Sequence, residues 1–123
     1  MQHSILIVED EKIVREGLAR ALSRTYKTYQ ASNGKEAMEV LKKNSGIKVI
    51  VSDLKMPELD GFEMLEKIRN ARRKIDVIFI TAFFSVESAV DAMRKGAFDY
   101  MTKPVDLKKL EKKIQSALES TEI

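Results

Sequence analysis

The stretch VIVSDLKMP, residues 49–57, decides the fold of this chain because it joins a predicted strand to an acidic loop. Its first three residues are β-branched and apolar, which is typical of a strand covered on both faces of a sheet. Asp53 ends this run, and Asp60-Gly61 then marks a loop. An apolar helical pattern starts at Phe62. The stretch therefore predicts a strand, a loop and a helix, with Asp53 at the carboxyl end of the strand.

Similar units precede and follow this stretch, so that short β-rich runs alternate with helical patterns five times. Five such units predict an α/β fold of the (βα)5 type. We expect a doubly wound, five-stranded parallel sheet with helices on both faces and the flavodoxin-like strand order 2-1-3-4-5. One domain over residues 1–123 is expected, since this length is usual for a domain. The predicted strands cover residues 5–8, 28–31, 49–52, 77–80 and 98–102.

Apolar residues recur at helical spacing after these strands, and we expect the resulting stripes to face the core. Met38, Met64 and Met93 fit the same core spacing. Gly96 is expected to end the fourth helix. The stripes of the fourth and fifth helices consist of Val86, Ala89, Val90, Met93, Leu107, Leu110, Ile114 and Leu118.

The composition excludes some classes of site. The chain has no cysteine, which rules out disulfides and thiolate metal sites. Its formal net charge of +3 is mild, and no reading motif accompanies the lysines, so we expect no direct nucleic-acid binding. No apolar run approaches the roughly 20 residues that span a bilayer, and no signal peptide is visible. We therefore predict a cytoplasmic protein that contacts no membrane.

Polar side chains stand where the predicted strands end. Glu9-Asp10 follows the first strand, Asp53 the third, Thr81 the fourth and Lys103 the fifth. Ligands of such sheets bind beyond the carboxyl ends of the strands, so we expect these side chains to share one cleft. Three carboxylates close together repel one another, and a cation relieves this repulsion. Oxygen ligands without histidine or cysteine suit Mg²⁺.

These residue types fit the steps of phosphoryl transfer. An aspartate can act as a nucleophile that forms an aspartyl phosphate, and Asp53 is the candidate here. Mg²⁺ and the ammonium of Lys103 would neutralise charge on the oxygens of the transferring group. The hydroxyl of Thr81 would donate a hydrogen bond to one of those oxygens. The strand ends therefore predict a Mg²⁺-dependent phosphoacceptor site.

Five motifs carry a resemblance to a known family: Glu9-Asp10, residues 52–57 (SDLKMP), Asp60-Gly61, Thr81-Ala82 and residues 99–104 (DYMTKP). Together they resemble the receiver domains of bacterial two-component response regulators, in the same order and over nearly the whole chain. The resemblance implies that Asp53 accepts the phosphoryl group and that Thr81 and Lys103 read it. It further implies a cis peptide before Pro104. The implied Mg²⁺ ligands are Glu9, Asp10, Asp53 and the backbone carbonyl of Lys55.

Further residues take their roles from the resemblance. Tyr100 matches the aromatic switch position. Thr81 and the ring of Tyr100 would move together once Asp53 is phosphorylated, which shifts the population between inactive and active forms. Lys55 and Phe83 match positions that tune the access of water to the phosphoryl group. The bulk of Phe83 predicts slow self-dephosphorylation.

The resemblance also implies partners. The donor would be a phosphohistidine on a histidine kinase or a histidine phosphotransfer protein, since the single histidine here, His3, is away from the strand ends. We expect this partner to dock on Ile13, Val14, Pro104 and Val105. The resemblance is also compatible with a homodimer through the fourth helix and the fifth strand.

Other functions fit the residues less well. A flavodoxin-like electron carrier needs a phosphate-binding loop rich in Ser, Thr and Gly after the first strand, where this chain has Glu9-Asp10-Glu11. A phosphatase of the haloacid dehalogenase type places its nucleophile after the first strand in an Asp-x-Asp pattern, which this chain lacks. Glycine-rich nucleotide motifs are missing too. We expect a signalling domain rather than an enzyme, either complete in itself or part of a regulator with a DNA-binding or ATPase output domain.

Overall fold

The computed structural model describes residues 2–121 and contains a five-stranded parallel sheet in the order β2-β1-β3-β4-β5. The predicted α/β fold and strand order are thereby confirmed. The strands are β1 (Ser4–Val8), β2 (Lys27–Ala31), β3 (Ile47–Asp53), β4 (Asp76–Thr81) and β5 (Asp99–Thr102). The helices are α1 (Lys12–Leu22), α2 (Gly34–Lys43), α3 (Gly61–Asn70), α4 (Val86–Arg94) and α5 (Leu107–Thr121).

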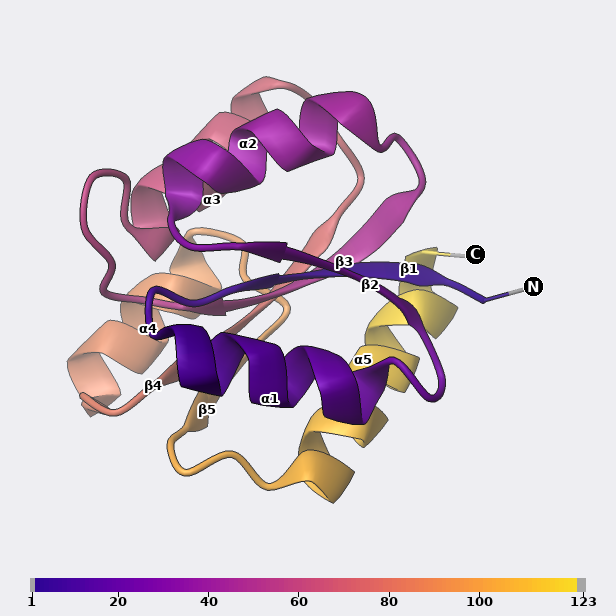
Figure 1. The fold of residues 1–123 in the computed structure, drawn as a ribbon. Coiled ribbons are helices and arrows are strands. Elements are labelled where there is room, and N and C mark those ends of the chain that lie inside the picture. The colour runs from indigo at the N-terminus through magenta and orange to yellow at the C-terminus, as the bar shows by residue number, and fades with distance from the viewer. Residues whose placement is uncertain (1, 122–123) are drawn as a thin grey trace.

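Helices cover both faces of the sheet (Figure 1). α2 and α3 lie over one face, with the buried side of α4, and α1 and α5 lie over the other. Neighbouring residues of β3 enter opposite cores, since Ile50 packs with α2 and α3 whereas Val49 and Val51 pack with α1 and α5. This arrangement explains why three successive residues of the strand, 49–51, are all apolar rather than every second one.

The orientation of α4 corrects a prediction, because its apolar stripe faces outward. Val86 is 72% exposed, Val90 and Met93 are exposed as well, and Ala92 is the buried residue of this helix. The expectation that Met93 lies in the core is wrong, and Leu107 at the start of α5 is also exposed. Helical spacing reveals a stripe, but it does not say whether the sheet or the solvent lies beside it.

The loop that follows β3 is anchored at Gly61. The Gly61 amide donates to the carbonyl of Leu54 at 2.9 Å, and a side chain at this position would meet the ring of Phe79 at 2.6 Å. Only glycine permits this close approach. Asp60 and Glu63 form a capping box at the start of α3. These contacts define the path of the chain just after the end of β3.

The helices between residues 2 and 121 all lack the combination of length and apolar character that a membrane crossing demands. That a single domain extends over residues 1–123 stays a prediction, and its ends at 1 and 122–123 lie outside the described residues.

Candidate functional site

The register of the sheet brings the predicted site residues to one edge. β1 and β3 pair up to residues 8 and 52, so that Glu9 and Asp53 come next on two adjacent strands. β4 and β5 pair up to Thr81 and Thr102, so that Lys103 is the residue just beyond the partner of Thr81. Because all the strands are parallel, these four residues stand at their common carboxyl end.

Lys103 connects two of the predicted carboxylates. Its ammonium donates to Oε1 of Glu9 at 2.5 Å and to Oδ2 of Asp53 at 2.9 Å. Glu9 is 0% exposed and Asp53 is 8% exposed, so both carboxylates depend on protein partners rather than on water. Glu9 also accepts the amide of Glu11 at 3.3 Å. Lys103 thus stabilises a buried pair of anions that would otherwise repel each other.

The surroundings of these groups shift their affinity for protons. Burial raises the pKa of the Glu9 carboxyl above its usual value, although the hydrogen bond from Lys103 opposes this shift. Burial also acts to lower the pKa of the Lys103 ammonium, but the hydrogen bonds that it donates to Glu9 and Asp53 outweigh burial and raise that pKa overall. Lys103 is therefore a cation at neutral pH.

Three carboxylates at this edge form a cluster suited to a divalent cation. Glu9, Asp10 and Asp53 each offer one oxygen, and these oxygens all lie within 4.8 Å of one another. Oxygens that share one Mg²⁺ lie up to about 4.2 Å apart, twice the usual Mg–O distance, so the cluster has nearly the size of one coordination shell. Asp10 is exposed, which leaves the cluster open to solvent on its side. The donor set and its size fit a hard cation such as Mg²⁺.

The loops after β3 and β4 contact each other beside this cluster. The amide of Lys55 donates to Oδ1 of Asp53 at 3.4 Å, and the Lys55 ammonium lies 5.3 Å from the centre of the Phe83 ring. Thr81 is fully buried, and its hydroxyl oxygen accepts the amide of Phe83 at 3.1 Å. Phe83 itself is 68% exposed. The two residues expected to tune water access therefore form a cation–π pair, and one of them, Lys55, contacts Asp53 through its backbone amide.

Comparison with known proteins decides the family. A family model for the response regulator receiver domain matches residues 5–115 of this chain. The chain belongs to this receiver domain family. The predicted class, a signalling domain related to the response regulators of two-component systems, is confirmed.

Relatives of this receiver domain include longer regulators and solved receiver structures. Regulatory protein AtoC of Escherichia coli strain K12 is 40% identical over 94% of this chain and 25% of its own length. Transcriptional regulatory protein ZraR of Klebsiella oxytoca is 36% identical over 99% of this chain and 28% of its own length. The chain thus spans about a quarter of these relatives. A receiver domain structure from Clostridium thermocellum superposes with a TM-score of 0.91 at 29% identity and covers 97% of this chain and 96% of that one.

Tyr100 of this receiver is held by two residues that the sequence did not reveal. Its hydroxyl lies 2.6 Å from Oγ of Ser88 on α4, and its ring is 5.5 Å from the ring of Phe84 at a tilt of 58°. Tyr100 is half-buried between these neighbours. The serine pair Ser85 and Ser88, three residues apart at the start of α4, is the one sequence signal of a hydroxyl cluster here.

The predicted docking residues of the receiver differ in exposure. Ile13 on α1 is 88% exposed, and Pro104 is exposed too, whereas Val14 and Val105 are half-buried against the core of α1 and α5. The peptide between Lys103 and Pro104 is cis, as predicted. Ile13 and Pro104 are accordingly the members of this set that a partner can reach without any change in the receiver.

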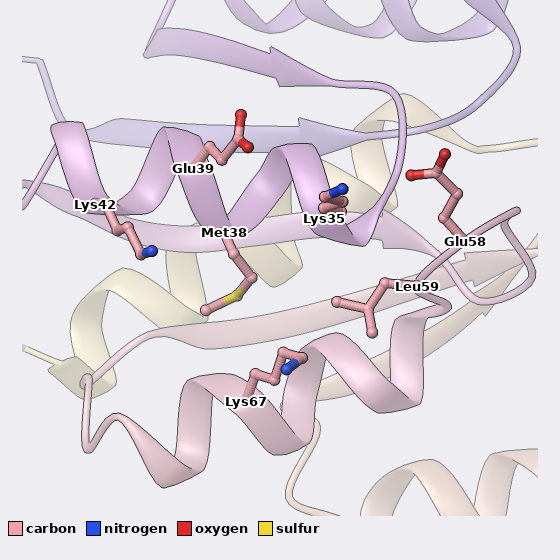
Figure 2. A pocket seen from close by; sticks show the side chains of 7 residues that line it. All are labelled: Lys35, Met38, Glu39, Lys42, Glu58, Leu59 and Lys67. Carbon is pink, nitrogen blue, oxygen red and sulfur yellow. The ribbon is translucent and has the colours of Figure 1, made fainter.

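A separate groove of the receiver lies between α2 and α3, as Figure 2 shows. Met38 and Leu59 contribute its apolar part, and the side chain of Lys67 lies between them and α3. None of the residues lining the groove belongs to the acidic cluster. They are Lys35, Met38, Glu39, Lys42, Glu58, Leu59 and Lys67.

Proposed function

We propose that Asp53 accepts a phosphoryl group from a phosphohistidine on a histidine kinase or phosphotransfer protein in the cytoplasm. The reaction depends on Mg²⁺, and the receiver then changes conformation to control an output domain or partner. One observation carries this proposal, namely that Lys103 bridges Glu9 and Asp53 while Asp10 completes the acidic cluster. This set combines an acceptor, a fixed cation and ligands for a mobile cation at one edge of the sheet.

The transfer needs no group beyond those named. A carboxylate oxygen of Asp53 forms a bond to phosphorus while the bond from phosphorus to the donor's imidazole nitrogen breaks, and the imidazole takes up a proton. Lys103 remains beside Asp53 and neutralises charge on the transferring oxygens. Glu9, Asp10, Asp53 and the carbonyl of Lys55 would hold Mg²⁺. When bound, this ion supplies the positive charge that draws a phosphoryl group into an acidic pocket.

The proposed phosphorylation takes place on a side chain of the receiver itself, that of Asp53. Asp53 is both the nucleophile and the carrier of the product, so we propose a signalling domain and not an enzyme that acts on a separate substrate. Loss of the phosphoryl group by hydrolysis is proposed to be slow because of the bulk of Phe83, whose ring lies against the side chain of Lys55, two residues after the acceptor.

Thr81 and Tyr100 are proposed to carry the switch. Thr81 is buried at the end of β4. Within residues 2–121, the one hydrogen bond of its hydroxyl is the one that the oxygen accepts from the Phe83 amide. Its hydrogen is thus available for a phosphoryl oxygen on Asp53. Movement of Thr81 would make room for the ring of Tyr100, which now contacts Phe84 near the surface.

The exposed stripe of α4 is proposed as the face of a homodimer. Val86, Val90 and Met93 leave apolar side chains in water next to β5. Burial of such a patch against a second copy would remove this area from solvent. Sedimentation equilibrium of the chain and of Val90→Glu tests this, since the substitution should lower association; identical behaviour of the two would refute the interface.

The phosphoacceptor proposal is tested by incubating the protein with acetyl phosphate, with and without Mg²⁺, and measuring its intact mass. We expect a gain of one phosphoryl group that requires Mg²⁺ and is lost in Asp53→Ala. Asp106→Asn is the matched control, because this exposed aspartate at the start of α5 should leave the reaction unchanged. Phosphorylation that persists in Asp53→Ala would refute the assignment of the acceptor.

A further inference from the structure

A chain of hydroxyl groups links Tyr100 on β5 to the first turn of α4. Ser85 caps this helix, since its Oγ accepts the amide of Ser88 at 3.0 Å. The hydroxyls of Ser85 and Ser88 are 2.9 Å apart, and Oγ of Ser88 is 2.6 Å from the Tyr100 hydroxyl. The same Ser88 hydroxyl also lies 3.2 Å from the carbonyl of Ser85. The helix cap and the tyrosine therefore share one residue, Ser88, through its amide and its hydroxyl.

A count of hydrogens assigns the direction of these bonds. Ser88 has a single hydroxyl hydrogen, and the carbonyl of Ser85 can only accept. If Ser88 donates to that carbonyl, its oxygen is left to accept from both Ser85 and Tyr100. This is the one arrangement in which every contact within hydrogen-bonding distance is satisfied. Tyr100 is therefore the donor to Ser88, and turning its ring away removes a donor from the cap of α4.

The bond from Tyr100 is important because α4 has few other attachments at this end. The structure describes every residue of α4, and Ala92 is the single buried one. It lies near the carboxyl end of the helix. Val86, in the first turn, is exposed. Little apolar burial holds the first turn of α4 to the sheet, so its order depends strongly on hydrogen bonds.

We propose that Ser88 is a positioning residue that couples the orientation of Tyr100 to the order of the first turn of α4. The inference rests on the proposed function, in which the ring of Tyr100 moves inward once Asp53 is phosphorylated. That movement breaks the bond to Ser88 and loosens the start of α4, where the exposed apolar stripe begins. The coupling is reciprocal, so loss of the Ser88 hydroxyl also favours the moved form of Tyr100.

The test measures hydrogen exchange of the amides of Ala89 and Val90 in the unphosphorylated full chain, without any phosphodonor. Tyr100→Phe should speed this exchange about fivefold, the factor that one net hydrogen bond is worth. Ser88→Ala should speed it by at least this factor, because it also removes the two contacts of the Ser88 hydroxyl with Ser85. The double variant should exchange no faster than Ser88→Ala, because that change has already removed the bond to Tyr100. Ser88→Thr keeps a hydroxyl and should restore slow exchange. Ser120→Ala, which removes a serine hydroxyl on α5, should leave these amides unchanged.

Two results would overturn the coupling. One is exchange at Ala89 and Val90 that does not change in Tyr100→Phe; the other is a double variant about fivefold faster than Ser88→Ala, since independent effects would multiply. A second arm repeats the measurement after acetyl phosphate and Mg²⁺, where the parent should approach the exchange rate of Tyr100→Phe. A parent that is phosphorylated but keeps slow exchange would refute the link to the switch. A parent that takes no phosphoryl group would refute the proposed function, while the first arm still decides the role of Ser88.

Discussion

Asp53 ends β3 and Lys103 follows β5, and although these strands are not neighbours, the Lys103 ammonium lies 2.9 Å from the Asp53 carboxylate. β4 runs between them, and the lysine side chain reaches past its end. The same ammonium contacts Glu9, which follows β1. One cation therefore joins residues from β1, β3 and β5 and offsets the repulsion between two buried anions.

Removal of this cation should destabilise the metal-free protein. Lys103→Met leaves the buried carboxylates of Glu9 and Asp53 unpaired, which we expect to cost about 3 kcal/mol of unfolding free energy. Urea denaturation in the presence of a chelator measures this loss. Saturating Mg²⁺ should recover part of it, because a second cation then neutralises the same carboxylates.

Lys113→Met is the matched control for this experiment. Lys113 pairs with Asp99 at 2.5 Å, but the two side chains are 31% and 34% exposed, so the pair should be worth about 1 kcal/mol or less. Equal losses in the two lysine variants would contradict the account of the acidic cluster.

Mg²⁺ should stabilise the fold through the acidic cluster, in particular through Asp10. An ion present at about 100 times its dissociation constant adds about 2.7 kcal/mol to the unfolding free energy. Asp10→Asn removes one ligand from an exposed position and should weaken this effect without harming the metal-free fold. Calorimetric Tm values over a Mg²⁺ titration measure both, with Glu39→Gln as a control. A Tm that rises equally in parent and Asp10→Asn would argue against this cluster as the metal site.

Phe83 should slow the loss of the phosphoryl group from Asp53. Phe83→Asn removes the ring that contacts the Lys55 ammonium, and we expect dephosphorylation about two- to fivefold faster, the factor that an exposed cation–π contact is worth. Decay of the phosphorylated protein, followed by intact mass, gives the rate. Phe83→Leu keeps most of the bulk and separates shielding by size from the contact with Lys55. An unchanged rate in Phe83→Asn would refute shielding.

Ile13 should contribute to docking of the phosphohistidine partner. Its side chain is 88% exposed, so Ile13→Glu should slow phosphotransfer from the cognate kinase about tenfold without altering the fold. Val14→Glu should have a similar effect. The rate with acetyl phosphate should not change, and Gln115→Glu, at an exposed position on α5, serves as a control for an added surface charge. Unaltered kinase transfer in both α1 variants would remove this surface from consideration.

Much of the acidic site could be predicted because parallel strands end together. Once residues 49–53 are assigned to a strand, and the apolar runs before and after them to the other strands, the strand order places Glu9, Thr81 and Lys103 near Asp53. No side-chain detail is needed for that inference. The capping residue Asp60 and the helix-ending Gly96, with φ of 99°, also follow from local chemistry.

Contacts that depend on the rotation of a helix could not be predicted in the same way. Val86, Val90 and Met93 have core spacing, and only the close packing of Ala92 shows that they face outward. The bond between Ser88 and Tyr100 depends on the same rotation. Capping by a residue far away in the sequence could not be predicted either. One case is Arg73, whose side chain donates to the carbonyl of Leu41 near the end of α2. Such contacts depend on tertiary packing, and the periodicity of apolar residues gives no information about it.

The site of phosphorylation can be read directly by chemical reduction. After reaction with acetyl phosphate and Mg²⁺, borohydride converts an aspartyl phosphate to homoserine, and peptide mass spectrometry then locates the changed residue. We predict homoserine at position 53 alone, and none when Mg²⁺ is left out. Homoserine at Asp10 or any other position, with Asp53 unchanged, would contradict the central claim.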